Sequence, residues 1–373
     1  MRVNKSLLIP FIIVSLVSCK ESHTLDVSNL DELELSFKKK VIEIDENYLS
    51  SYMDWHPYTT EETTMLVGYN QRMHSLDFFD LEKLQAVEQI KLEKEGPNAI
   101  GAVQGFFLHS KDSVFLFERG KLHLGNLKGE VYSTFQLYDL FGFESKGEPN
   151  VNHYFKLKYF PDSHSILFYI TFHNSSNLEK QESPLVSEFN IEKKEFKSLP
   201  IYHSDVYKKN NGRMGFITYL GFQDKMNEKF IFNFQYDPNI YSLDKNSKIS
   251  DSNLEDDFSP LIDESEIDLH GINNRHYLTS IPDPWRNVIY RANWEAPKEG
   301  KEVSFIEKGL SLSVFDGNLN HLLDYRLPDY TYQINNWFVW KDGLYLNVAH
   351  PKNSSVSENE IVFHILTPDL QNH

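Results

Sequence analysis

The feature that most constrains the fold is a pattern that recurs six times between residues 64 and 368: an apolar strand, a loop, a second alternating strand, a tight turn and a third strand. A further candidate strand precedes each copy. The turns between the last two strands carry Gly, Asn, Asp or Lys, as tight hairpins require. A four-stranded antiparallel unit that repeats every 49 to 64 residues is typical of the blades of a β-propeller. The six copies are aligned by Met65, Val114, Ile166, Phe230, Val288 and Leu344.

The two ends of the chain predict how such a ring closes. The sixth copy lacks its last strand, because the sequence ends soon after EIVFHILTP. The segment LELSFKKKVIEI, at residues 33–44, has strand character and belongs to no copy. We expect it to pair with the last copy, which removes the exposed edges that an open sheet would present.

The predicted fold class is therefore all-β: a six-bladed β-propeller over residues 31–373, closed by an N-terminal strand. Phe and Tyr, with 27 and 20 residues, are favoured on strands, and apolar residues at helical spacing are scarce. A seven-bladed ring is the nearest alternative, because the long stretch 201–273 has room for further strands. Two β-sandwich domains are disfavoured, since no linker rich in Pro, Gly or Ser divides the chain.

The N-terminus has the layout of an export signal. Arg2 and Lys5 precede an apolar run of 11 residues, about half of the ~20 that a membrane-spanning helix needs. Ser18 follows this run, and Cys19, the only cysteine, comes directly after Ser18. The run LVSC (16–19) resembles the bacterial lipobox, in which the signal is cut before a cysteine that carries diacylglycerol. This resemblance implies a signal peptide at 1–18, lipid on Cys19 and a tether at 19–30, with ~0.8 kcal/mol of membrane affinity for each buried methylene.

Taken together, the lipobox and the repeat resemble the uncharacterised six-bladed propeller lipoproteins of Bacteroidota, a family defined as a domain of unknown function. The resemblance covers nearly all of the mature chain and implies an outer-membrane lipoprotein of the cell envelope. It implies no catalytic residues. Lys20-Glu21 is similar to the start of surface-export signals in this group, but Ser22-His23 departs from it, so periplasmic and surface locations both stay open.

The charge of the chain excludes one class of partner. Removal of the signal takes away two positive charges and changes the net charge from −17 to −19. Such a chain repels phosphate backbones, and no basic stripe offsets this. We therefore expect no nucleic acid partner. The predicted partners are the membrane, through lipid on Cys19, and a glycan, a peptide or an envelope protein.

The topology of a propeller indicates where a binding site would lie. Loops between the second and third strands of each unit share a face with the connections between units, and binding groups tend to sit on loops held by a rigid scaffold. Trp with Arg, Asn and His nearby suits a flat polar ligand, although for any single residue the interpretation as an ordinary loop or rim residue is favoured. The ligand-binding candidates on this face are His173, Tyr202, His203, Arg213, His270, Asn274, Arg275, Arg291, Trp294 and His350.

Three other aromatic segments are placed elsewhere by the same parity. Trp55-His56 and the run 283–286 fall on the opposite face of the ring, where packing and turn formation explain them. Trp337 and Trp340 sit at strand spacing, and we expect them to fill space between units.

The familiar catalytic patterns are missing. The sequence has no His-Glu-x-x-His pair, no Gly-x-Ser-x-Gly elbow and no Gly-rich phosphate loop. The acidic runs at 255–257 and 263–266 lack the order of a calcium loop, so no metal and no cofactor is expected. The predicted function is a binding or scaffolding module for an extracellular ligand or partner protein. The alternative is a glycan hydrolase or lyase that uses two loop-face acids from different units.

Overall fold

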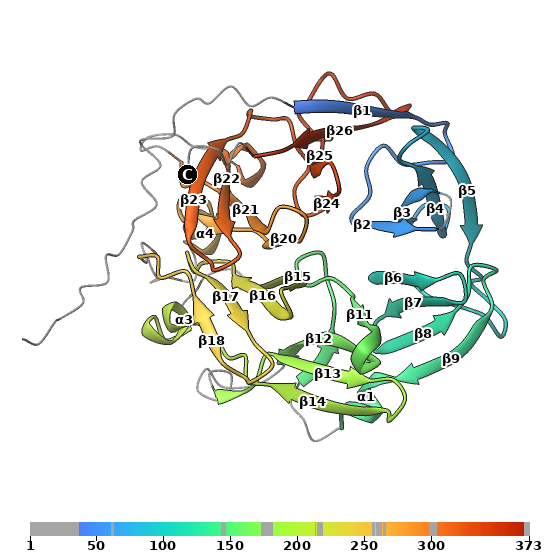
Figure 1. Cartoon of the computed structure of the whole chain (residues 1–373), viewed down its shortest axis with the longest axis horizontal. Coiled ribbons are helices and arrows are strands. Elements are labelled where there is room, and N and C mark those ends of the chain that lie inside the picture. The colour runs from blue at the N-terminus through green and yellow to red at the C-terminus, as the bar shows by residue number, and fades with distance from the viewer. Residues whose placement is uncertain are drawn as a thin grey trace, which may run out of the picture.

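A computed structural model of the chain describes residues 37–368, apart from 61–62, 143–146, 173–181, 213, 215–218, 256–257, 259–262, 264–265 and 298–303. Its strands form antiparallel units around a central axis (Figure 1). The predicted all-β propeller fold is therefore confirmed. The signal peptide, Cys19 and the tether lie outside the described residues.

Each of the first three units begins with a strand close to the axis and proceeds outward (Figure 1). The first contains β2 (Trp55–Thr59), β3 (Thr64–Asn70), β4 (Ser75–Asp80) and β5 (Gln85–Lys91). The second contains β6 (Gly105–Ser110), β7 (Ser113–Glu118), β8 (Lys121–Gly125) and β9 (Val131–Gln136). The third contains the short β10 (Gly147–Asn150) and β11 (Tyr159–Phe160), which both pair with β12 (Ser165–Phe172), then β13 (Val186–Asn190) and β14 (Glu195–Leu199).

The remaining three units repeat this order. The fourth contains β15 (Leu220–Met226), β16 (Lys229–Phe234), β17 (Ile240–Leu243) and β18 (Ile249–Asp251). The fifth contains β19 (His276–Tyr277), β20 (Ile281–Asp283), β21 (Val288–Trp294), β22 (Leu310–Asp316) and β23 (His321–Arg326), with β19 and β20 both paired to β21. The sixth contains β24 (Phe338–Trp340), β25 (Gly343–Asn347), β26 (Glu360–Leu366) and, from the other end of the described chain, β1 (Phe37–Glu43). The described strands thus form six units, and none of them belongs to a seventh.

The ring closes as the sequence predicts. β1 pairs antiparallel with β26 along its whole length, from Phe37 opposite Leu366 to Glu43 opposite Glu360. Glu43 also contacts β5 in a single parallel pair, so that the sixth and first units form one continuous sheet of eight strands. Ile42 is fully buried among residues of both units. The head of the described chain therefore supplies the outermost strand of its last unit.

The hydrophobic core is divided among the junctions between neighbouring units. One cluster of buried side chains lies at each of the six junctions, and aromatic rings dominate several of them. At the second junction the rings of Phe117 and Phe168 are 5.7 Å apart, and at the closing junction those of Trp55 and Phe363 are 5.5 Å apart. Each sheet is covered on both sides, so its middle strands are buried on both faces. Such strands have near-continuous apolar sequences and do not alternate between apolar and polar residues.

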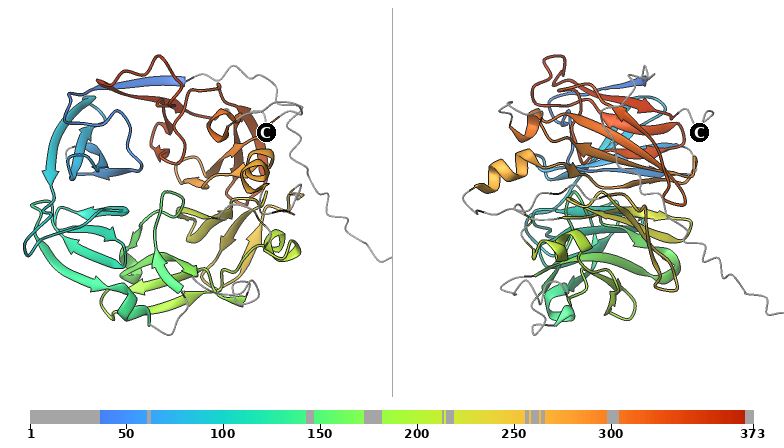
Figure 2. Two further views of the ribbon diagram at one scale, coloured as in Figure 1. Left: turned by 180° about the vertical axis from the view of Figure 1, so that it is seen from behind. Right: turned by 90° about the vertical axis from the view of Figure 1, so that its left-hand side faces the viewer.

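The ring has two unlike faces. The loop face carries the loops between the second and third strands of each unit and all connections between units, including α1 (Leu137–Phe141), α3 (Asp205–Lys209) and α4 (Ile267–Asn273). The turn face carries the short turns between the other strands, among them the 3₁₀ turn η2 (Pro161–Ser163). A second 3₁₀ turn, η4 (Phe305–Glu307), lies on the loop face. In the side view of Figure 2, α4 projects from the loop face.

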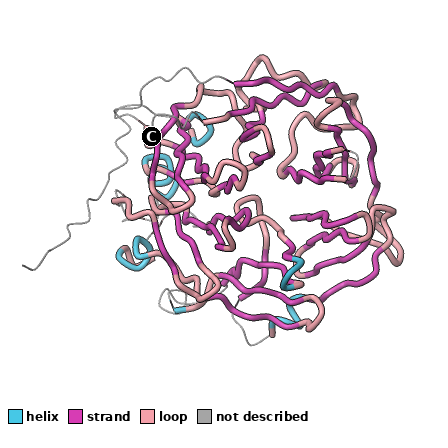
Figure 3. Tube along the Cα trace, viewed as in Figure 1, coloured by secondary structure: helices cyan, strands magenta, loops and turns pink. Residues whose placement is uncertain are grey.

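Helices are short and few beside the strands (Figure 3). In the part of the chain that the structure describes, no helix has the length and apolar character needed to cross a membrane.

Candidate functional site

Three cavities follow the axis of the ring. The loop-face cavity, of about 370 Å³, lies between the fifth and sixth units and shares Met53 and His153 with a neighbouring cavity of about 280 Å³. That second cavity shares Asp54, Phe106 and Leu157 with the turn-face cavity, of about 180 Å³, which opens among the first strands of all six units. The axis therefore offers one mouth on each face.

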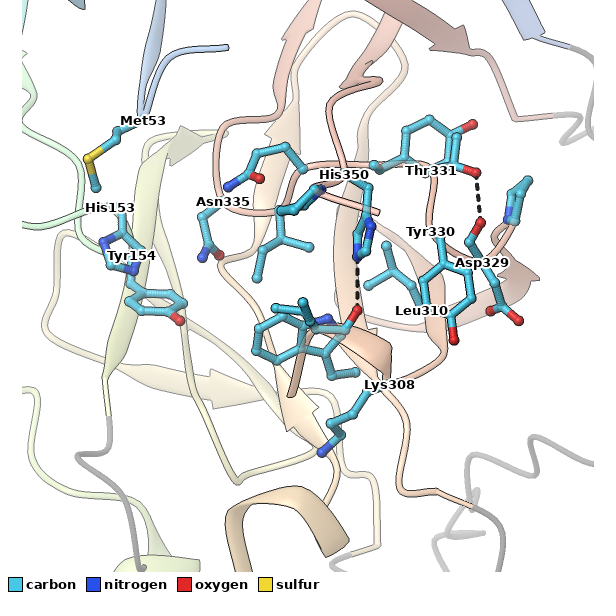
Figure 4. A pocket seen from close by; sticks show the side chains of 17 residues that line it. Met53, His153, Tyr154, Lys308, Leu310, Asp329, Tyr330, Thr331, Asn335 and His350 are labelled. Atoms are coloured by element: carbon cyan, nitrogen blue, oxygen red, sulfur yellow. Dashed lines mark hydrogen bonds between the residues drawn. The ribbon is translucent and has the colours of Figure 1, made fainter. Parts of the chain in front are cut away.

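Long loops build the loop-face cavity (Figure 4). Residues 328–335, which connect β23 to β24, form one wall, and residues 306–310, which lead into β22, form another. Tyr154 completes it from the third unit, where the first strand is interrupted between β10 and β11. The interruption brings the chain to the axis, because Phe155 there pairs with Phe222 of the fourth unit.

Aromatic rings and apolar side chains dominate this cavity. Tyr154 stacks on Tyr219 at 4.5 Å, and its burial raises the pKa of its phenol to about 12, so it stays protonated. Trp294, Tyr330 and Tyr332 add three more rings. At the rim, Met53, Ile306 and Tyr330 are 64%, 44% and 44% exposed, which is unusual for large apolar side chains. Apolar groups exposed together in this way mark binding surfaces.

Two histidines line the cavity in uncharged form. The amide of Lys352 donates to Nδ1 of His350 at 3.0 Å, so this nitrogen is unprotonated and Nε2 donates to the Ile306 carbonyl at 2.8 Å. Burial and the nearby Lys156 lower the pKa of His153 to about 4, which leaves it neutral at pH 7. Both imidazoles therefore line the cavity as uncharged rings.

Lys308 links this cavity to α4. Its ammonium donates to the carbonyls of Gly271 and Asn274, at 3.2 and 2.5 Å, at the C-terminal end of the helix. Burial, followed by the charge of Arg275, lowers the pKa of Lys308 to about 7. The lysine thus fixes α4 beside the cavity and contributes less than a full positive charge at neutral pH.

The structure gathers only some of the predicted binding residues. Trp294 and His350 line the loop-face cavity. Asn274 does not line it, but its carbonyl accepts a hydrogen bond from Lys308, which does. Tyr202 and His203 line a separate cavity of about 560 Å³ beside α3 on the fourth unit.

Of the remaining candidates, His270 lies in α4, where its ring packs against Tyr236 and Phe258, and Arg275 follows α4. His173 and Arg213 lie outside the described residues.

Arg291 requires a correction, because it is not at the edge of a loop. It lies in the middle of β21, fully buried, with its guanidinium 4.2 Å from the ring of Tyr277 and 5.2 Å from that of Phe315. Nη1 donates to the carbonyl of Pro238 in the fourth unit. Burial lowers its pKa to about 10, so it stays charged at neutral pH. Arg291 therefore joins two units and is closed to a ligand on the loop face.

Sequence reasoning missed several residues of this cavity, notably Tyr154, Lys308, Tyr330 and Asn335. The run PDYTYQINNW (328–337) contained a usable signal. It is rich in aromatic and amide side chains, and it lies in a connection between units, where the predicted face would place it.

Of the two segments predicted to lie on the opposite face, the run 283–286 forms a turn on the turn face, whereas Trp55 and His56 begin β2 at its loop-face end. Trp55, His56, Pro284 and Trp285 all line the turn-face cavity. Trp340 lines it as well, and it also packs against the buried cluster between the sixth and first units, as expected.

Trp337, by contrast, is buried and donates from Nε1 to the Gln333 carbonyl. Among the described side chains, no three of His, Cys, Asp or Glu gather as metal ligands would.

Comparisons with known proteins place the chain by family and fold. A family model described as a domain of unknown function, DUF4221, matches residues 22–323. A solved DUF4221 structure from Bacteroides vulgatus has a TM-score of 0.76 at 17% identity and covers 90% of this chain and 99% of its own. A Bacteroides fragilis protein, provisionally designated as exported, has a TM-score of 0.56 at 11% identity and covers 93% of this chain and 99% of its own. None of the curated proteins compared by sequence is significantly similar.

Proposed function

This chain belongs to the DUF4221 family, and on that premise we propose that it is a lipid-anchored binding module of the cell envelope. The loop-face cavity receives an uncharged apolar or aromatic side chain of a peptide or partner protein. The observation that carries the proposal is the coincidence of a cavity lined by aromatic rings with three exposed apolar side chains at its rim: Met53, Ile306 and Tyr330. Anchoring residues of protein interfaces bury themselves in such pockets.

The electrostatics of the cavity support an uncharged guest. His153 and His350 are neutral, and Lys308 is held by backbone carbonyls. A charged side chain would lose its hydration here, and the one carboxylate among the described lining residues, Asp329, is already paired with Arg326. The side chains of Gln333 and Asn335, which also line the cavity, are of the type that hydrogen-bonds a peptide backbone.

The position of the closing strand supports the orientation that a tethered binding module needs. Phe37 pairs with Leu366, the last residue of β26, so β1 begins at the turn face. A tether that runs from lipid on Cys19 to Phe37 therefore joins the propeller at that face. In the tethered protein, the loop-face cavity opens on the side away from the point of attachment.

The glycan-cleaving alternative has less support. Cleavage with two carboxylates needs both to flank one glycosidic bond, ~5–10 Å apart. Among the described residues that line the loop-face cavity, only Asp329 carries a carboxylate, and it accepts from Arg326 at 2.6 Å. Incubation of the protein with polysaccharides, followed by an assay for new reducing ends or unsaturated products, distinguishes the two functions.

Selection of a random peptide display library on the mature protein tests the binding proposal. We expect enriched peptides to share one aromatic or aliphatic anchor and to lose at least tenfold in affinity against Trp294→Ala. The matched control is Trp285→Ala on the turn face, which should bind them normally. Enriched peptides that bind Trp294→Ala and wild type equally would refute the assignment.

The anchor has a test of its own. Labelling with a fatty-acid analogue in the native host should mark the wild-type chain and leave Cys19→Ser unlabelled. Equal labelling of both chains, or of neither, would contradict lipidation at this residue.

A further inference from the structure

We propose a second binding site on the turn face: the cavity between Trp285 and the Lys158–Asp224 pair binds an uncharged sugar residue of a glycan. This site is separate from the loop-face cavity and does not depend on the function proposed for it. Its cavity of about 180 Å³ is lined by the first strands or adjoining turns of all six units, so it lies on the axis of the ring.

Two tryptophans form an aromatic shelf at this mouth. Trp285 lies in the turn after β20, and Trp340 ends β24, so they come from neighbouring units. Their rings are 5.4 Å apart at 63°. Trp285 is 48% exposed, so part of its indole is available to a ligand. An indole supplies a large rigid apolar surface, which suits the C–H face of a sugar ring.

The shelf is held in position before any ligand arrives. Asp283, which is fully buried, accepts from the backbone amides of Trp285 and Arg286 at 3.0 and 3.1 Å. Its other oxygen accepts from the guanidinium of Arg286 at 2.7 Å. That guanidinium also donates to the carbonyls of Trp340 and Lys341, at 3.3 and 2.7 Å. One buried carboxylate thus fixes both turns, and a preorganised surface loses little conformational entropy on binding.

Polar groups suited to hydroxyls line the same cavity. The ammonium of Lys158 and the carboxylate of Asp224 are 2.5 Å apart, and both side chains remain partly exposed. Gln223 lies beside them and donates to the Trp337 carbonyl at 3.3 Å. A carboxylate accepts hydrogen bonds and an ammonium donates them, so such a pair satisfies both functions of adjacent sugar hydroxyls.

The charge balance decides between a sugar and a charged ligand. The cavity contains two lysines and two aspartates, and each lysine is paired: Lys158 with Asp224, and Lys156 with Asp54 at 2.6 Å. An anionic ligand would have to displace an aspartate, and a cationic one would have to displace a lysine. Rings, paired charges and an amide together favour an uncharged polyhydroxylated ring.

Calorimetric titration of the full mature protein with cellohexaose, maltohexaose and chitohexaose tests the site. We expect at least one of the three to bind, and Trp285→Ala to weaken that binding at least tenfold while Trp285→Phe retains most of it. Asp224→Asn should also weaken it, because Lys158 is left without its acid. The matched control is Trp294→Ala on the loop face, which should bind the oligosaccharide as wild type does.

Two results would overturn the proposal: no binding of any of the three oligosaccharides to the wild type, or equal affinity in wild type and Trp285→Ala. Trp285 is half exposed, so its variants are expected to fold, and a thermal melt that matches wild type confirms this. Retained peptide binding by Trp285→Ala with lost oligosaccharide binding separates this proposal from the function proposed for the loop face.

Discussion

The two mouths of the axis differ in how they are built. The loop-face mouth is formed mainly by two adjacent units, through long connections of unequal length, and its rim is apolar. The turn-face mouth is formed by all six units, through the strands and short turns that every unit repeats, and its charges are paired. The turn-face cavity thus arises from elements that every unit repeats. The loop-face cavity depends instead on long loops that only single units have.

A polar contact that crosses the ring lies where the cavities meet. The ammonium of Lys156, in the third unit, lies 2.6 Å from Asp54 before the first unit and donates at 2.9 Å to the carbonyl of Asn335 before the sixth. Asp54 lines the turn-face cavity and its neighbour, and Asn335 lines the loop-face cavity. Lys156 therefore holds three units together at the level where the cavities meet.

Lys156→Met should have the largest effect on stability, because it removes the contacts that join three units between the two cavities. It leaves the carboxylate of Asp54 without its cation, and we expect a loss of about 3 kcal/mol in the free energy of unfolding. Urea unfolding followed by tryptophan fluorescence measures it. The double variant with Asp54→Asn should recover part of the loss, and a double variant no more stable than Lys156→Met would show that the ion pair is not the cause.

Asp283→Asn should disturb the turn-face mouth and leave the loop-face mouth unchanged. The amide keeps the size of the side chain but weakens the contact with the Arg286 guanidinium, so we expect about 1–2 kcal/mol of destabilisation and weaker oligosaccharide binding. Peptide binding at the loop face should not change. Chemical unfolding and the two binding assays measure these effects, and equal loss at both mouths would show that the mouths are coupled.

The dependence of stability on pH should reflect one histidine at each mouth. Burial lowers the pKa of His153, at the loop-face mouth, to about 4 and that of His56, at the turn-face mouth, to about 3. Both are neutral in the folded chain, whereas the unfolded chain takes up a proton at each below pH ~6.5, so stability is lost as pH falls from about 6.5 towards 4.

We expect each histidine to contribute about 2 kcal/mol of the stability lost between pH 7 and pH 5. Unfolding curves measured at both values test this. His153→Gln and His56→Gln should each flatten the dependence, and an unchanged slope in either variant would show that its histidine is not a source.

Tyr330→Ser should have the smallest effect on stability. The ring is 44% exposed at the loop-face rim, so the free energy of unfolding should change by no more than about 0.5 kcal/mol. Peptide affinity should nevertheless fall, because the rim loses an apolar contact. A large loss of stability would show that Tyr330 supports the loop and is not simply available to a partner.

Much of the fold was predictable because strands and turns leave local signals. Repeat copies such as SVFLFERGKLHLG read directly as β7 and β8, since tight turns require particular residues and strands favour aromatic ones. The pairing of β1 with β26 followed from a missing strand at one end and a spare strand at the other. The two faces followed from the parity of antiparallel strands, which placed Trp285 correctly.

The site was less predictable, because its members come from distant parts of the chain. Tyr154 and Tyr330 line one cavity only because the first strand of the third unit is interrupted and turns inward. Arg291 looked like a loop residue, yet strands buried on both faces lack the alternation that would reveal an inward-facing side chain.

The sequence by itself thus determined the repeat, the class of fold, the closing strand and the face on which long loops gather. The tertiary structure alone decided which loops meet, which charges are paired and which aromatic side chains remain exposed. The physical reason is the range of the forces involved. Turn chemistry and strand propensity act between neighbours in the chain, whereas a cavity is the space left when whole units pack against one another.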